Sequence, residues 1–153
     1  MSIAFVREPE GGEAFEDLPD RPLSPHQNFV TPQGLALIEA ELERLHAEHG
    51  ALSPDDKAGL ARTSRDLRYW TARRNSAQVI EPSPSDTVHF GSTVTVERED
   101  GIRQTFRIVG EDEADPTKGS IAYVAPLARA LTGKQAGDTV TVADHEVEII
   151  EVR

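Results

Sequence analysis

Residues 88–131, VHFGSTVTVEREDGIRQTFRIVGEDEADPTKGSIAYVAPLARAL, decide the fold of this chain. Apolar and polar residues alternate over residues 92–98 and 104–109, which predicts two half-buried β-strands. The EDG sequence between these runs suits a tight hairpin turn. A third strand is expected at residues 120–124, and Pro126 then begins a short helix with the sequence PLARAL.

The remaining C-terminal residues also have strand patterns. Residues 139–142 and 146–152 are expected to pair around Ala143–Asp144–His145. Several strands with one inserted helix define an α+β domain, which we place at residues 87–153. A linker at residues 80–86 precedes this domain. Together with the residues that lead into it from Ser76, it contains two prolines and three serines.

A helical hairpin is predicted upstream, over residues 31–79. Thr31 is expected to cap the first helix, with Pro32 at its first position and a stop near Gly50. Leucine and isoleucine recur at spacings of three and four from Leu35, as in a short coiled coil. Because only a few residues separate this helix from the next, the two helices should pack antiparallel.

The second helix is predicted to run from about Pro54 to about Gln78. Ser53 is its expected cap, and two aspartates, Asp55 and Asp56, fill its first turn. Its apolar seam runs from Leu60 with the same spacing of three and four.

Composition restricts the possible function classes. The 153 residues carry a net charge of −11, which argues against DNA binding driven by phosphate neutralisation. Residues 1–30 hold six acids and two bases with several prolines and glycines, and are expected to form a flexible tail. Within it, residues 26–30, HQNFV, are expected to pack locally as extended chain. No apolar run reaches the roughly 20 residues of a membrane span, and the chain has no cysteine. We expect a cytoplasmic monomer that makes no contact with membranes.

The order of these segments resembles the bacterial Gre transcript-cleavage and elongation factors. The resemblance rests on TPQGLALIEAELERL in the first helix, SAQVIEP at the exit of the second, and VHFGSTVTV, FRIVGEDEAD and IAYVAPLARALTGK in the C-terminal domain. It covers about 120 residues. It implies that the C-terminal domain is an FKBP-like antiparallel β domain that binds RNA polymerase at the rim of its secondary channel, while the hairpin enters the channel. The protein would then be an accessory factor and not an enzyme, and needs no cofactor of its own.

The acidic turn after the second strand is one candidate for the docking surface. The resemblance gives a docking role to Asp112, Glu113, Asp115 and Pro126. The simpler interpretation is a solvated turn in which an aspartate accepts hydrogen bonds from backbone amides. The two interpretations are compatible with each other.

The tip of the hairpin would carry any contribution to transcript cleavage. In the family an acidic DLxEN-like motif helps to hold a second magnesium ion and a water in the polymerase active site, and this chain has EHGALSPDDKAGLARTS instead. Asp55 and Asp56 are the acids at the apex, and a helix start explains both of them. The hairpin also looks shorter than the family's arm. We therefore expect a modulator of elongation without strong stimulation of cleavage; the alternatives are an active cleavage factor that uses Asp55 and Asp56, or an adaptor for another protein.

The second helix has a basic face. Arg62, Arg65, Arg68 and Arg73 are predicted to lie away from its apolar seam, whereas Arg74 lies on the seam, in reach of a glutamate of the first helix. These four arginines are candidates for contact with the channel walls or with nascent RNA. The alternative is a charged helix that balances the acidic first helix. The five histidines have no metal-ligand spacing, so no metal site is expected.

Overall fold

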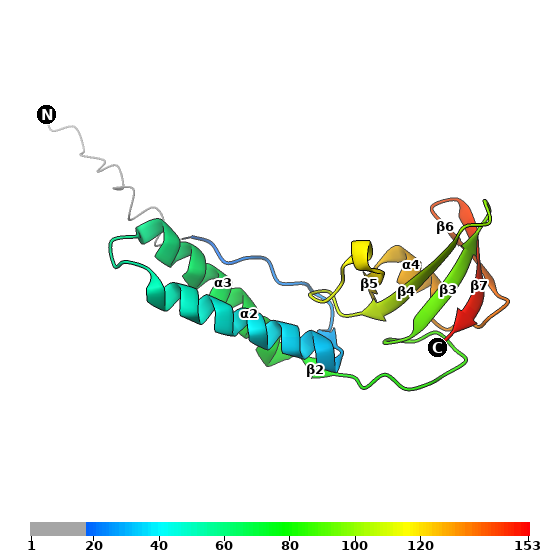
Figure 1. The fold of residues 1–153 in the computed structure, drawn as a ribbon, viewed down its shortest axis with the longest axis horizontal. Coiled ribbons are helices and arrows are strands. Elements are labelled where there is room, and N and C mark those ends of the chain that lie inside the picture. Colours follow the sequence, from blue (N-terminus) through cyan, green and yellow to red (C-terminus); the bar gives the residue numbers. More distant parts are fainter. Residues whose placement is uncertain (1–17) are drawn as a thin grey trace, which may run out of the picture. The chain divides into compact units, whose positions relative to one another are not determined.

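The computed structural model describes residues 18–153 (Figure 1). These residues form two compact units. One unit contains residues 18–25 and 38–75, and the other contains residues 26–37 and 76–153. The predicted α+β architecture, a helical hairpin followed by a β domain with a short helix, is confirmed.

The hairpin consists of helices α2 (Pro32–Ala51) and α3 (Lys57–Ser76), which run side by side in Figure 1. Two contacts show that the helices are antiparallel. His49 Nδ1 lies 2.6 Å from Thr63 Oγ1 near the apex, and Arg74 Nε lies 3.5 Å from Glu39 Oε1 at the other end. Ile38 and Leu45 of α2 are fully buried, as expected for the apolar seam of an amphipathic helix.

The first helix begins as predicted, and the second begins later. The Thr31 side-chain oxygen accepts a hydrogen bond from the Gly34 amide at 3.0 Å, which caps α2. On α3 the cap is Asp56, whose carboxylate accepts from the Gly59 amide at 3.0 Å. The prediction that Ser53 caps the helix is therefore wrong, because residues 53–56 form a separate turn closed by the Asp56 amide and the Ser53 carbonyl.

The β domain is a single five-stranded sheet in the order β5-β4-β3-β7-β6. Its strands are β3 (Thr93–Arg98), β4 (Arg103–Val109), β5 (Ser120–Ala122), β6 (Thr139–Val142) and β7 (His145–Val152). The sheet was predicted to be antiparallel, but β5 runs parallel to β4, so it is mixed. The reason is the connection: residues 110–119 carry the chain back across the sheet, and no hairpin turn joins the two strands.

One face of this sheet is covered by the short helix α4 (Pro126–Leu131) (Figure 1). Together they bury an aliphatic core, which consists of Val88, Val94, Val96, Ile108, Ile121, Ala128, Leu131, Val140 and Ile149. The strand residues of this list alternate with more exposed residues along β3, β5, β6 and β7, as the period of two requires. In β4, Val109 beside Ile108 is also fully buried.

A two-stranded parallel sheet joins distant parts of the same unit. Strand β1 (Phe29–Val30) pairs with β2 (Gln78–Val79), just after the end of α3. The centre of the Phe29 ring lies 5.3 Å from the centre of the Tyr123 ring and 6.0 Å from that of the Phe90 ring. Residues 18–30 were predicted to belong to a flexible tail, and here they have defined contacts; the rest of that predicted tail, residues 1–17, lies outside the described residues.

Candidate functional site

The acidic turn follows β4 and contains Asp112, Glu113 and Asp115. Glu113 is 9% exposed at its side chain. Its carboxylate accepts a hydrogen bond from the Thr31 hydroxyl and lies 3.3 Å from Arg107 Nη1. Because Thr31 caps α2, Glu113 also places a negative charge at the N-terminal end of that helix, where the helix dipole favours it. Glu113 therefore connects the acidic turn to Thr31 and to Arg107, and this structural role is separate from any role in docking.

Asp115 caps the short 3-10 helix η1 (Pro116–Lys118). Its carboxylate accepts from the Thr117 hydroxyl at 2.5 Å and from the Thr117 amide at 3.1 Å. These hydrogen bonds, with the hydroxyl as the larger cause, lower the pKa of Asp115 below its ordinary value of 3.8. This is the local role that the simpler interpretation of the turn predicts for an aspartate.

Asp112 and Pro126 complete the predicted docking set. Asp112 is half-buried in the turn that follows Gly110, and Pro126 is exposed at the first position of α4. Within the set, Glu113 and Asp115 have evident structural roles. A docking role for the four residues stays a prediction.

The apex of the hairpin presents both predicted aspartates to solvent. Asp55 and Asp56 are exposed in the turn between α2 and α3. The Asp56 carboxylate accepts a hydrogen bond from the Gly59 amide. Asp55 has backbone contacts: its amide donates to Ser53 Oγ at 3.2 Å, and its carbonyl accepts from the Lys57 amide at 3.0 Å. The turn thus places two carboxylates at the tip, one of which is needed to begin α3.

The arginines of α3 are largely paired within the molecule. Arg62 forms an ion pair with Glu48 of α2, and Arg65 Nε lies 3.4 Å from Asp66 Oδ1. Arg68 Nε lies 2.5 Å from Asp20 Oδ1, and Arg68 Nη2 donates to the Leu18 carbonyl at 3.2 Å. The predicted basic face is therefore mostly neutralised by acids of its own unit.

Residues 18–25, called here the N-terminal segment, contact the same helix through Arg21. The Arg21 guanidinium lies 3.9 Å from the centre of the Tyr69 ring and 5.9 Å from that of the Trp70 ring. Arg21 Nη1 also lies 3.5 Å from Asp66 Oδ1. A guanidinium over two aromatic rings with a carboxylate beside it combines a cation–π interaction with an ion pair. No periodic signal in the sequence predicts this contact.

The placement of Arg73 corrects the predicted basic face. Arg73 was predicted to lie on the exposed side of α3, but it is only 3% exposed. It follows Tyr69 by four residues and Asp66 by seven, so it lies on the side of α3 that Arg21 contacts. Arg74, predicted on the seam in reach of a glutamate, has an exposed side chain that pairs with Glu39.

A line of alternating charges connects the two helices near the apex. Arg44 lies 2.5 Å from Glu41 and 3.0 Å from Glu48, and Glu48 also pairs with Arg62. The hydrogen bond from Arg44 lowers the pKa of Glu41, and that from Arg62 lowers the pKa of Glu48. Of these exposed pairs, Glu48–Arg62 joins the two helices and favours their antiparallel register, although each pair contributes little by itself.

Metal-binding clusters and membrane-spanning helices are absent from residues 18–153. No three histidine, aspartate or glutamate side chains in that range gather as a metal would need. No helix in the same range is both long and apolar enough to cross a membrane.

Comparison with known proteins identifies the family. The family described as "Transcription elongation factor, GreA/GreB, C-term" matches residues 83–153. The transcription elongation factor GreA of Alkalilimnicola ehrlichii is 35% identical over 81% of this chain and 96% of its own length. GreB of Yersinia pestis is 39% identical over 82% of this chain and 88% of its own length. Gfh1 of Thermus thermophilus, a solved structure, has 18% identity and a TM-score of 0.41 over 84% of this chain and 99% of its own. The chain therefore belongs to the GreA/GreB family of transcription elongation factors.

Proposed function

We propose that this protein binds RNA polymerase as an elongation factor and modulates elongation without strongly stimulating transcript cleavage. Membership of the GreA/GreB family supports the binding to polymerase. Asp112, Asp115 and Pro126 are the residues that we assign to docking, since they lie in the turn and at the helix start for which the family resemblance implies that role. Glu113 acts with them by fixing the turn to Thr31 and Arg107.

The apex of the hairpin supports the second part of this proposal, that the protein does not strongly stimulate transcript cleavage. Recruiting a magnesium ion to a second site requires carboxylates that are free to coordinate it. Here the apex offers Asp55 and Asp56, and Asp56 already accepts the Gly59 amide. Binding a metal through both oxygens of Asp56 would therefore compete with the cap of α3, whose loss costs about 1 kcal/mol.

The length of the hairpin supports the same conclusion. Helices α2 and α3 have 20 residues each, so each spans about 30 Å. The family's arm is longer in sequence. A shorter arm that docks at the same rim would leave Asp55 and Asp56 farther from the catalytic centre.

A stalled elongation complex tests the proposal. Purified protein should bind the complex and cause little shortening of the transcript at its 3′ end. The matched variant is D55N/D56N, because asparagine caps a helix as well as aspartate does but lacks the charge. The wild-type protein and D55N/D56N should have the same small effect on cleavage.

Three outcomes separate the alternatives. Rapid shortening that D55N/D56N abolishes would show a cleavage factor that uses these two carboxylates. Normal folding without any binding to polymerase would contradict both versions and favour an adaptor for another protein. Weaker binding by Asp112→Lys, but not by Glu151→Lys on β7, would locate docking at the acidic turn.

A further inference from the structure

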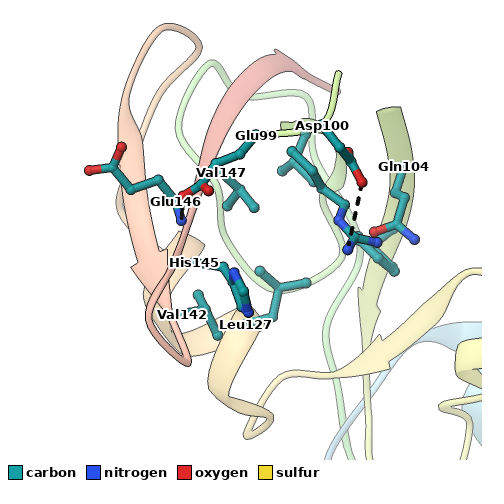
Figure 2. Close-up of a pocket in the computed structure, with 11 residues that line it drawn as sticks. Glu99, Asp100, Gln104, Leu127, Val142, His145, Glu146 and Val147 are labelled. Carbon is teal, nitrogen blue, oxygen red and sulfur yellow. Dashed lines mark hydrogen bonds and ion pairs between the residues drawn. The ribbon is translucent and has the colours of Figure 1, made fainter. Parts of the chain in front are cut away.

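The helix that covers the sheet is too short to cover all of it. Helix α4 has six residues and is about 9 Å long, whereas the seven residues of β4 extend over about 23 Å. The uncovered part of the inner face forms a pocket of about 380 Å³ (Figure 2). Side chains of β3, β4, α4, β6 and β7 line it, so it lies entirely within the β domain.

The floor of this pocket is apolar. Figure 2 shows Leu127, Val142 and Val147 around the same space, and Val96 and Phe106 also line it. Val96 is buried, while Phe106, Leu127, Val142 and Val147 are half-buried and keep apolar surface open to solvent. This open apolar floor adjoins the closed core, because Val96 belongs to both and the other four side chains pack against that core.

The rim is acidic. Glu99, Asp100 and Glu146 contribute three carboxylates, against one guanidinium from Arg98. Arg98 lies 4.0 Å from Asp100, so the pair is loose. Glu99 Oε1 accepts a hydrogen bond from the Glu146 amide at 3.0 Å, which links the β3–β4 turn to the start of β7. The rim thus presents a fixed excess of negative charge around an apolar hollow.

We propose that this pocket binds a segment of a partner protein in which an apolar side chain is followed by lysine or arginine. A volume of this size lies in the usual range of ligand pockets and accepts one large apolar side chain. The carboxylates at the rim attract cations and repel phosphates and other anions, which favours a basic segment over a nucleotide. None of the predicted docking residues lines the pocket, so this proposal does not depend on how the protein binds polymerase.

The lining of the pocket contains few aromatic side chains. Among the residues that line the pocket, Phe106 alone is aromatic, while Phe90 and Tyr123 pack on Phe29 elsewhere in the domain. A binding pocket with one aromatic side chain in its lining suits an aliphatic or single aromatic anchor, held by contact and charge.

Peptide titrations of the full-length protein test this proposal. The probe is acetyl-Gly-Phe-Lys-Lys-Gly-amide, and the matched controls replace Phe with Ala or both Lys with Glu. Methyl NMR signals of Leu127, Val142 and Val147 should shift and saturate with the first peptide, and should respond at least fivefold more weakly to either control. No shift at millimolar probe, or equal shifts with the Glu-containing peptide, would contradict the proposal.

Two variants on one strand give a second, independent test. Glu146→Lys reverses a rim charge, whereas Glu151→Lys makes the same change on β7 outside the pocket. Both positions are exposed, so both variants should fold. Glu146→Lys should weaken binding of the basic probe about fivefold, because one attraction becomes a repulsion of similar size. Equal affinities for the two variants would overturn the assignment of the rim.

Discussion

Glu113 is the residue on which the acidic turn depends. Its carboxylate receives the Thr31 hydroxyl and the Arg107 guanidinium, and Arg107 Nη2 also donates to Gln33 Oε1 at 3.0 Å. Gly34 of α2 lies beside the Glu113 carboxylate. Any residue with a Cβ at position 34 would clash with this carboxylate. One acidic side chain of the turn thus positions the start of α2 against the sheet of its own unit, which charge patterning along the sequence does not reveal.

Asp115 gives a pH-dependent prediction. Its pKa is lowered in the folded state, so its contribution to stability is present above the unfolded pKa and is lost as pH falls through the folded one. We expect the wild-type protein to be more stable than Asp115→Asn at neutral pH, and this difference to shrink below about pH 4. Urea unfolding at a series of pH values measures it.

The cause of this shift can be tested directly. Thr117→Val removes the hydroxyl that contributes most to lowering the pKa of Asp115 and leaves the backbone amide in place. NMR titration of the Asp115 carboxyl carbon should therefore give a higher midpoint in Thr117→Val than in the wild-type protein. Identical midpoints would mean that the hydroxyl does not stabilise the charged form.

At the scale of elements, the β6–β7 hairpin contains strained backbone. Val142 pairs with His145, which leaves Ala143 and Asp144 as a two-residue turn with φ of 50° and 65°. Such a turn requires positive φ at both positions, which alanine disfavours. Ala143→Gly should raise the free energy of unfolding by about 0.5–1 kcal/mol, measured by chemical denaturation.

A matched substitution separates this effect from a general effect of glycine. Ala40 is exposed in the middle of α2, where glycine costs about 1 kcal/mol relative to alanine. Ala40→Gly should therefore destabilise the protein while Ala143→Gly stabilises it. A loss of stability in both variants would show that the turn is not strained.

The element boundaries show what local sequence can determine. The strands of the five-stranded sheet and α4 were predicted within two residues, because alternation and a proline at the helix start are local signals. Strand β1 was anticipated only as extended chain, because its pairing with β2 joins residues about 50 positions apart. The start of α3 was misplaced because both Ser53 and Asp56 are good caps, and only the turn at residues 53–56 decides between them.

At the scale of the whole molecule, the sequence predicted which residues belong to the candidate site. It did not predict which of their side chains are already paired within the protein. The four arginines of α3 were correctly located on one helix, yet the sequence did not show that Glu48, Asp66 and Asp20 pair with three of them. These acids come from α2, from α3 itself and from the N-terminal segment. Ion pairs between distant segments depend on tertiary structure, which helix periodicity does not encode.

The N-terminal segment consequently gives the last prediction, which concerns access to the basic face of α3. Asp20 occupies Arg68, and Arg21 lies over Tyr69 and Trp70. If this face contacts RNA, the segment must compete with RNA for the same groups. Replacing both residues, as in D20A/R21A, removes the contacts and leaves the net charge of −11 unchanged.

D20A/R21A should bind single-stranded RNA more tightly than the wild-type protein, by a few-fold in a fluorescence anisotropy titration. One additional phosphate contact should also steepen the slope of log affinity against log salt by about 0.7. Because the net charge is the same, long-range attraction cannot explain either change. The sole tryptophan, Trp70, reports release of the segment, since removal of Arg21 should alter its fluorescence emission. Altered emission with unchanged RNA affinity and slope would show that the segment leaves but that this face of α3 does not bind RNA.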